Sequence, residues 1–250
     1  MSLVWWPDRP RWASMSSNEL IDQVAFLESA EVEVEGRMPW SSNATFAVIM
    51  RDGATEHRAI YKPLRGERPL WDFEPGLHRR ERAAFVLSEA LGLHVVPTTV
   101  LRDGPFGEGS FQWFVDADHS EHYFTILEQR ADLAQRLRDI AVFDIAANNT
   151  DRKSGHCLLA DDDVWAIDNG LCFAAPFKLR TVIWDFVGEP IPDEVVAALQ
   201  QIAAEPGAAL RDLLSVDEID AMRHRCDRLA AAGVLPEDDT GGQRYPWPLV

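Results

Sequence analysis

The hydrophobic pattern of this chain changes its period along the sequence, and that change restricts the folds it can adopt. Up to about residue 115, strand-like runs in which apolar and polar residues alternate dominate, with two helical stretches among them. Beyond residue 130, apolar residues recur every three or four positions, which is typical of helices packed on a core. A sheet-rich first half and a helical second half indicate an α+β fold.

The predicted elements follow this division. The first half is expected to hold five antiparallel strands, at residues 32–34, 45–50, 58–62, 95–101 and 110–115. Its two helices are expected at residues 16–28, opened by Ser16 and Glu19 as a capping box, and at 77–91, closed by Gly92. The second half is expected to hold helices at 132–147, 193–204 and 216–232, with a short strand pair at 157–159 and 164–167. Ser215 and Glu218 form another capping box, before the last helix.

The charge of the chain narrows the classes of partner. It carries 41 acidic and 24 basic side chains, a formal net charge of -17 over 250 residues. Such a chain repels nucleic-acid phosphates and anionic membrane surfaces, so neither is an expected partner. The chain has three cysteines, and their spacing matches no metal-site motif. It has no apolar run long enough to span a membrane and no apolar run at the N-terminus that would indicate a signal peptide. These features together predict a cytoplasmic protein.

Two charged residues in the first half suggest phosphate chemistry. Lys62 ends the third strand in Tyr61-Lys62-Pro63, and alternation directs it to the face opposite Tyr61. Glu81 lies on the following helix, where it can hold the ammonium group as an ion pair. Taken alone, each is more commonly a surface charge.

Two acidic motifs in the second half strengthen this interpretation. Asp151 lies in a loop that continues to His156, and Asp168 opens an Asp-Asn-Gly sequence at the end of the next strand. Phosphoryl transfer needs one carboxylate to orient the acceptor hydroxyl and others to hold metal. A simple hairpin turn is the alternative explanation for Asp168 and its neighbours.

The combination of these motifs resembles the phosphatidylinositol 3-/4-kinase superfamily. The run NNTDRKSGHCLL…WAIDNGLCF resembles its catalytic and metal-binding segments, YKP its lysine strand, and GSFQWFV its hinge between lobes. The resemblance is closest to the type II phosphatidylinositol 4-kinases and their bacterial relatives, and to an uncharacterised actinobacterial kinase-like family. It covers residues 35–190.

This resemblance implies a role for each matching residue. Asp151 becomes the catalytic aspartate, with Lys62 and Glu81 as the phosphate-binding lysine and its partner, and Asp168 and His156 become the metal ligands. The nucleotide-binding residues it implies are Ser41, Ser42 and Asn43 over the phosphates, Lys62, and Gln112, Trp113, Phe114 and Val115 around the adenine.

Two departures from the family pattern affect the expected activity. His156 stands where these kinases usually have a metal-binding asparagine, so Mn²⁺ could compete better with Mg²⁺, or the protein could be a pseudokinase. The cysteine-rich palmitoylation stretch of the eukaryotic lipid kinases is absent, so a membrane or lipid substrate is not expected.

The sequence therefore predicts a two-lobed protein-kinase-like fold. The N-terminal lobe, residues 1–115, is an antiparallel sheet with a helix, and the mainly helical C-terminal lobe covers residues 116–250. The expected activity is transfer of the γ-phosphate of ATP, with Mg²⁺ or Mn²⁺, to a hydroxyl of a protein or small molecule. A nucleotide-binding pseudokinase and a nucleotidyl (AMP) transferase are the alternatives.

Overall fold

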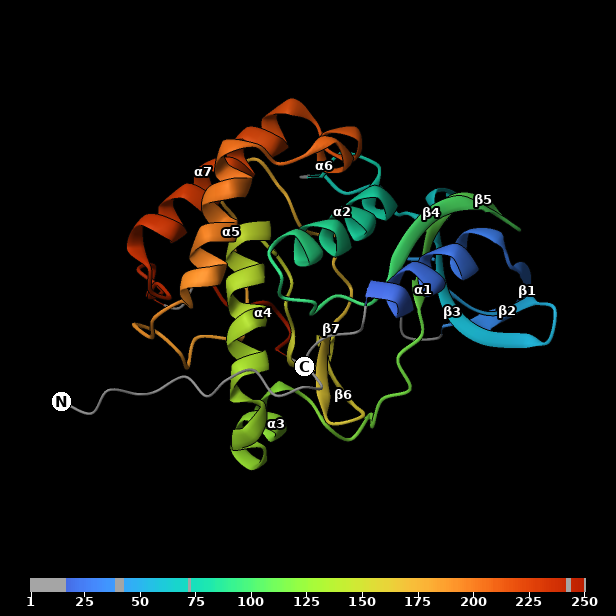
Figure 1. The fold of residues 1–250 in the computed structure, drawn as a ribbon, viewed down its shortest axis with the longest axis horizontal. Helices are drawn as coiled ribbons and strands as arrows, with labels where there is room; N and C mark the ends of the chain where they lie inside the picture. Colours follow the sequence, from blue (N-terminus) through green and yellow to red (C-terminus); the bar gives the residue numbers. More distant parts are fainter. Residues whose placement is uncertain (1–16, 39–42, 72, 242–243, 250) are drawn as a thin grey trace.

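The computed structural model describes residues 17–38, 43–71, 73–241 and 244–249. Its first half is built around an antiparallel sheet in the order β1-β2-β3-β5-β4. The strands are β1 (Glu31–Arg37), β2 (Phe46–Asp52), β3 (Thr55–Pro63), β4 (Thr99–Gly104) and β5 (Gly107–Trp113). Helix α1 (Ser17–Ser29) precedes β1, and α2 (Leu77–Ala90) lies between β3 and β4. Figure 1 shows the sheet and α1 at one end of the molecule, with α2 extending toward the other helices.

One face of this sheet packs under α1. Tyr61 of β3 pairs with Phe111 of β5, their rings stack with centroids 4.3 Å apart, and both residues are fully buried. Leu27 of α1 belongs to the same apolar cluster. Because successive strand residues point to opposite faces, Lys62 lies on the other face of the sheet. The sequence pattern around Tyr61 thus determines which way Lys62 points.

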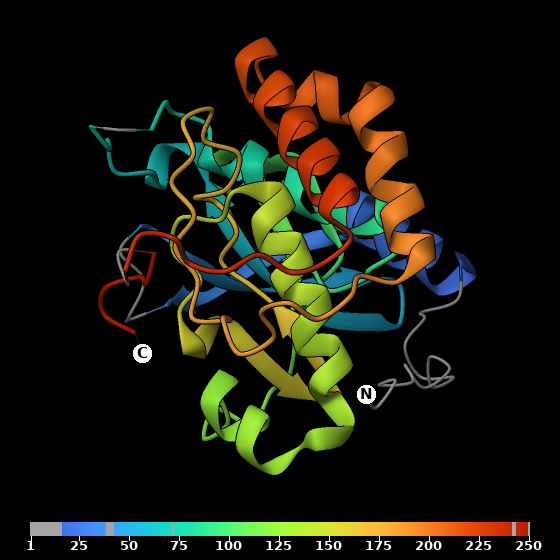
Figure 2. The same cartoon turned by 90° about the vertical axis from the view of Figure 1, so that its left-hand side faces the viewer.

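The second half is mainly helical. It contains α3 (Tyr123–Gln129), α4 (Ala134–Ala147), α5 (Asp193–Ala204), α6 (Ala208–Leu213), α7 (Val216–Ala232) and a hairpin of β6 (Cys157–Ala160) and β7 (Asp163–Ala166). Three short 3₁₀ segments are η1 (Leu64–Gly66), η2 (Ala131–Leu133) and η3 (Ser154–His156). Helix α4 is mostly buried, and α5 and α7 pack side by side, with α7 also touching α4 (Figure 2). Each helix in the described part of the chain is too short or too polar to cross a lipid bilayer.

Helix α2 is attached to the helical half as well as to the sheet. The Arg79 guanidinium donates to the carbonyl of Leu213 at the end of α6 (3.2 Å), and Arg80 pairs with Glu218 of α7 (2.6 Å). At the start of α2, the Glu67 carboxylate accepts two backbone N–H groups that the helix itself leaves unpaired. These contacts hold α2 in one position between the two halves.

The predicted fold class is confirmed, and most predicted elements are present within a few residues of their expected bounds. The capping box of Ser215 and Glu218 opens α7, and Gly92 follows α2 with φ 67 in the left-handed region. Ser16 of the first capping box lies outside the described residues.

Strand β4 and helix α3 differ from the sequence-based expectation for identifiable reasons. Strand β4 starts at Thr99 rather than Val95, because the Ser88 hydroxyl accepts the N–H groups of Val95 and Val96 (2.9 and 3.3 Å) and Pro97 has none. Helix α3 was not predicted from the sequence, and its first turn is capped by the His122 ring rather than by a common capping side chain.

Candidate active site

Lys62 lies at the centre of a charged group that joins the two halves of the protein. Its ammonium contacts the Glu81 carboxylate of α2 and the Asp168 carboxylate, the latter at 2.9 Å. Glu81 is almost fully buried, and about half of the Asp168 side chain is exposed. Burial alone would lower the pKa of Lys62, but Asp168 and Glu81 more than offset it and hold this pKa above its ordinary value. In turn, the Lys62 ammonium keeps the pKa of the Asp168 carboxyl well below its usual range.

The backbone around Asp168 directs its carboxylate toward Lys62. Asp168 has φ 56, in the left-handed region that few residues other than glycine adopt. The N–H of Asn169 donates to Glu81 (3.1 Å), so Glu81 holds both the lysine and this turn. A Cβ on Gly170 would lie 3.2 Å from the Glu81 carboxylate, so a larger residue there would push this carboxylate away by a few tenths of an ångström.

The loop after α4 carries Asp151 next to a second lysine. The Lys153 ammonium lies 2.6 Å from the Asp151 carboxylate, and both side chains are about one-fifth exposed. The Asn149 side chain accepts the N–H of Asp151 (2.9 Å) and fixes the start of this loop. Lys153 was missed in the sequence analysis, although its spacing of two residues from Asp151 was the available signal.

A buried ion pair fixes both acidic loops to α4. Arg152 is fully buried and bonds to Asp144 of α4, with a closest contact of 3.0 Å. It also donates to the carbonyl of Ile167 (2.7 Å) and to the Asn169 side chain (2.6 Å). One guanidinium therefore sets the distance between the loop of Asp151 and the turn of Asp168.

The two predicted metal ligands lie next to each other. His156 Nε2 is 3.6 Å from Asp168 Oδ2. Burial lowers the pKa of His156, with Asp168 acting against it, so the imidazole is held toward its neutral form, the form that binds metal. His156 Nδ1 accepts the N–H of Lys153 over 3.4 Å, a long and weak hydrogen bond.

This donor set is sparse for a metal site. Within the described ranges, no three His, Cys, Asp or Glu side chains gather closely enough to hold a metal ion on their own. A carboxylate and an imidazole suit Mg²⁺ or Mn²⁺ when phosphate oxygens and water supply the other ligands. The residues therefore fit a metal that arrives with a nucleotide.

The predicted phosphate-covering loop is described in part. Ser41 and Ser42 lie outside the described residues. The Asn43 side chain accepts the N–H of Arg68 (3.0 Å), which joins this loop to the segment before α2.

The predicted hinge residues lie at and just after the end of β5 and have different surroundings. The Gln112 side chain is buried and donates to the Thr99 hydroxyl (3.0 Å). Trp113 stacks on His57 with ring centroids 3.6 Å apart, on the face covered by α1. Its indole therefore points away from the face of Lys62, and only its backbone remains near the connection between the halves.

The connection itself offers a backbone donor at Val115. The N–H of Phe114 donates to the carbonyl of Arg58 (3.3 Å), which continues the pairing of β3 with β5. Among the backbone hydrogen bonds of the described residues, none engages the N–H of Val115, whose carbonyl accepts the N–H of Ala117 (3.0 Å).

Comparison with known proteins places the chain in a family. No protein-family model matches it. It is 37% identical to Protein Rv2133c of Mycobacterium tuberculosis over 266 aligned positions, which cover 91% of this chain and 95% of that protein. The chain belongs to the family of this mycobacterial protein. That name states no activity, so membership alone assigns none.

Solved structures that share this fold include a kinase. The Golgi casein kinase, crystallised with Mn and ADP, aligns with a TM-score of 0.58 at 15% identity over 94% of this chain and 81% of that chain. Hydra Fam20 with sugar aligns with a TM-score of 0.59 at 14% identity over 87% and 88%. At these identities the likeness shows the fold, and the fold is kinase-like. The narrower resemblance to phosphatidylinositol kinases stays a prediction.

Proposed function

We propose that this protein is an ATP- and divalent-metal-dependent phosphotransferase that modifies a hydroxyl group. The observation that carries the proposal is the convergence on Lys62 of Glu81 from the sheet half and Asp168 from the helical half. A surface lysine has no reason to be held by two carboxylates from segments so far apart in sequence. A lysine that binds phosphates next to a metal-binding acid does have such a reason.

In this proposal Lys62 and Asp168 separate when the nucleotide binds. Lys62 stays paired with Glu81 and donates its remaining hydrogen bonds to the phosphates. Asp168, no longer paired with Lys62, would bind the metal ion. The half-exposed Asp168 carboxylate has room for this exchange. When bound, the metal ion would neutralise charge on the phosphate oxygens and hold them for in-line attack.

His156 is the second metal ligand in this proposal. Its Nε2 faces Asp168, and coordination there requires the ring proton to lie on Nδ1. That tautomer gives up the hydrogen bond from the Lys153 N–H, and a bond of 3.4 Å costs little to lose. The imidazole favours Mn²⁺ relative to an asparagine at the same place.

Asp151 and Lys153 would act at the acceptor. Asp151 orients the acceptor hydroxyl and takes its proton, and the Lys153 ammonium beside it stabilises the charge that builds on the transferred phosphoryl group. Their partial exposure leaves both side chains accessible to an acceptor.

The adenine would lie against the face of the sheet that carries Lys62. Ala47 and Ile60 pair directly with each other on that face, and both are partly exposed. These two side chains would form an apolar contact surface for the adenine ring. The N–H of Val115 would donate the hydrogen bond that an adenine nitrogen accepts. Ser41, Ser42 and Asn43 remain the proposed cover of the phosphates.

The acceptor class stays open between protein and small-molecule hydroxyls. One structural neighbour is a casein kinase and the other was solved with sugar, so a protein substrate and a sugar ligand both occur on this fold. The net charge of -17 argues against an anionic membrane substrate.

ATP labelled at the α- or the γ-phosphate, with Mg²⁺ or Mn²⁺, tests the proposal. A phosphotransferase moves or releases the γ-label, whereas a nucleotidyl transferase moves the α-label. A pseudokinase binds ATP but shows no more turnover than the Asp151→Asn variant. Failure to bind ATP would contradict the proposal and both alternatives.

A further inference from the structure

The backbone of Arg180 lies beside the loop of Asp151, in a part of the site that the proposed function leaves unused. The Arg180 N–H donates to the carbonyl of Asn149 (2.8 Å), and its carbonyl accepts the N–H of Arg152 (3.0 Å). The N–H of Val182 continues this pairing by donating to the carbonyl of Arg152 (3.1 Å). The two segments therefore run parallel and side by side, at the spacing of neighbouring strands, about 4.8 Å.

This pairing also determines which way the two side chains point. Arg152 and Thr181 form a parallel bridge, and both side chains bond to the buried Asp144 carboxylate, each at 3.0 Å. Because successive residues of an extended segment point to opposite faces, Asp151 and Arg180 both point away from Asp144. The exposure of Arg180 and the partial exposure of Asp151 agree with this direction.

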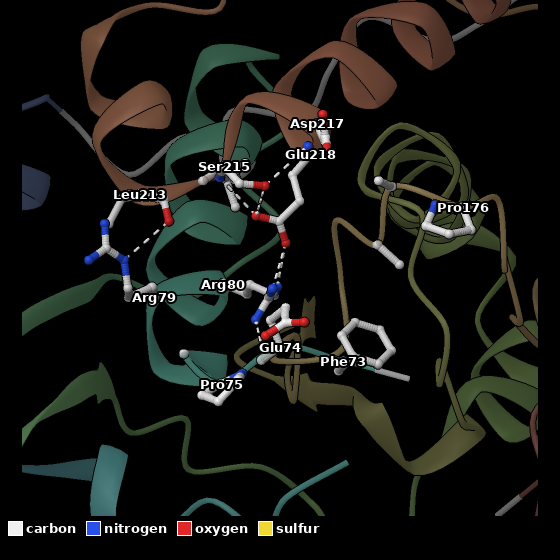
Figure 3. A pocket seen from close by; sticks show the side chains of 14 residues that line it. Phe73, Glu74, Pro75, Arg79, Arg80, Pro176, Leu213, Ser215, Asp217 and Glu218 are labelled. Carbon is white, nitrogen blue, oxygen red and sulfur yellow. Dashed lines mark hydrogen bonds and ion pairs between the residues drawn. The ribbon is translucent and has the colours of Figure 1, made fainter. Parts of the chain in front are cut away.

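The Arg180 guanidinium has no partner in the described part of the chain, where it forms no ion pair, hydrogen bond or ring contact. Figure 3 shows the contrary case beside a cavity at the start of α2, where Arg80 donates to the Glu218 carboxylate (2.8 Å). Asp151 pairs with Lys153 (2.6 Å) rather than with Arg180. The Arg180 guanidinium is therefore available to a ligand.

Arg180 lies on the opposite side of the loop of Asp151 from the proposed metal ligand, Asp168. On one edge of this loop, the N–H of Thr150 donates to the carbonyl of Leu171 (3.1 Å), three residues after Asp168. The segment of Arg180 pairs with the other edge. A nucleotide and metal ion bound at Asp168 would therefore approach Asp151 from one side, which leaves the side of Arg180 to the acceptor.

We propose that Arg180 determines acceptor specificity by binding an anionic group, a carboxylate or a phosphate, close to the hydroxyl that is phosphorylated. A guanidinium binds either group through two parallel hydrogen bonds. Lys153 lies two residues after Asp151, on the same face, and adds a second positive charge. In a chain of net charge -17, an anionic acceptor needs such local cations.

This inference rests on the proposed phosphotransfer, whose acceptor it narrows to acidic hydroxyl compounds. Arg180 would offset the repulsion between the anionic group of the acceptor and the γ-phosphate of ATP. Water carries no such group, so hydrolysis of ATP does not need Arg180 to bind the attacking molecule. Arg180 should therefore affect binding of anions beside Asp151 and leave the KM for ATP unchanged.

The first test is an NMR titration of the ¹⁵N-labelled chain with methyl phosphate and, separately, with acetate. Ionic strength is held at about 0.15 M, and AMP-PNP with Mg²⁺ occupies the nucleotide site. We expect saturable shifts of the Arg180 Nε–H and the Asp151 amide, and the anion that binds more tightly identifies the group. Trimethyl phosphate and acetamide, which are uncharged, should cause none. No saturable shift with either anion would overturn the inference.

Substitutions of Arg180 locate the binding. Arg180→Gln should weaken binding of the tighter anion at least 10-fold, and Arg180→Lys, which keeps the charge without the planar fork, should weaken it by a smaller factor. Arg228→Gln, the same change at an exposed position of α7, should leave it unchanged. Equal binding in Arg180→Gln and wild type contradicts the site.

Release of the γ-label to water separates the acceptor side from the ATP site. The tighter anion should inhibit this release in wild type, and Arg180→Gln should need at least 10-fold more of it, with the KM for ATP unchanged. A several-fold rise in that KM would assign Arg180 to the nucleotide and refute its role at the acceptor. If wild type binds the anion at Arg180 but neither binds AMP-PNP nor releases label, the proposed function fails and the anion site stands.

Discussion

Replacing Glu67 with glutamine tests how firmly the start of α2 is held. One carboxylate oxygen of Glu67 accepts the backbone N–H of His78 (2.9 Å) and contacts its ring nitrogen (2.8 Å), and the other accepts the N–H of Gly76 (2.8 Å). Burial alone would raise the pKa of Glu67, but these bonds lower it from 4.5 to about 2. The charged form is therefore strongly preferred in the folded protein.

The magnitude follows from that difference in pKa. A carboxyl whose pKa falls from 4.5 to about 2 on folding contributes about 3 kcal/mol at pH 7. The side chain is 11% exposed, so solvent weakens this little. Because the folded pKa is the lower one, the contribution is complete above pH 4.5 and declines as pH falls toward 2. At pH 3.5 it should be roughly 2 kcal/mol.

Urea denaturation followed by tryptophan fluorescence, at pH 7 and at pH 3.5, measures this contribution. We expect Glu67→Gln to lose about 3 kcal/mol of unfolding free energy at pH 7 and clearly less at pH 3.5. Glu128→Gln, at an exposed position of α3, should change stability by less than about 0.5 kcal/mol at both. A loss of unfolding free energy below about 1 kcal/mol in Glu67→Gln at pH 7, or a loss that is no smaller at pH 3.5 than at pH 7, would refute the reasoning.

Three further substitutions test the site's supports. Gly170→Ala brings a methyl group against Glu81, so we expect turnover to fall about 5- to 10-fold with little change in melting temperature, measured by steady-state kinetics and thermal unfolding. Arg152→Met leaves Asp144 charged in the core, so urea denaturation should show a loss of about 3 kcal/mol. The buried Asn148 side chain donates to the carbonyl of Ala174 and accepts the N–H of Lys178. Asn148→Ala removes both hydrogen bonds and puts alanine at φ 52, so amide hydrogen exchange in residues 174–178 should accelerate at least 10-fold.

Each of these substitutions has an outcome that contradicts its premise. Unchanged turnover in Gly170→Ala would mean that Glu81 does not need its observed position. A loss below about 1 kcal/mol in Arg152→Met would show that Asp144 is adequately solvated without its partner. Unchanged exchange in Asn148→Ala would show that other contacts hold the segment.

The sequence was most informative where a proposed site residue lies near the end of a regular element. Lys62 lies at the end of β3, whose alternation defines its face, and Asp168 lies two residues after the end of β7. Asp151 follows a helix closed by Asn148 in the left-handed region, a common helix end. Local pattern sufficed because backbone geometry determines the direction of such residues.

The features that sequence did not predict depend on contacts between distant segments. The face on which Trp113 lies follows from where α1 packs, which no local pattern states. Lys153 resembles an ordinary loop lysine until Asp151 is placed beside it. Helix α6 follows Pro206 and Gly207, which are signals for a loop, and contacts with α2 stabilise it.

The central claim is that Asp151 takes part in transfer of the γ-phosphate. The most direct measurement is the rate of γ-label transfer or release, with Mg²⁺ or Mn²⁺, for wild type, Asp151→Asn and Asp161→Asn. The last makes the same chemical change in an exposed turn between β6 and β7. We predict at least about a 100-fold loss in Asp151→Asn, with ATP binding preserved, and no change in Asp161→Asn. Equal rates in all three proteins would contradict the claim.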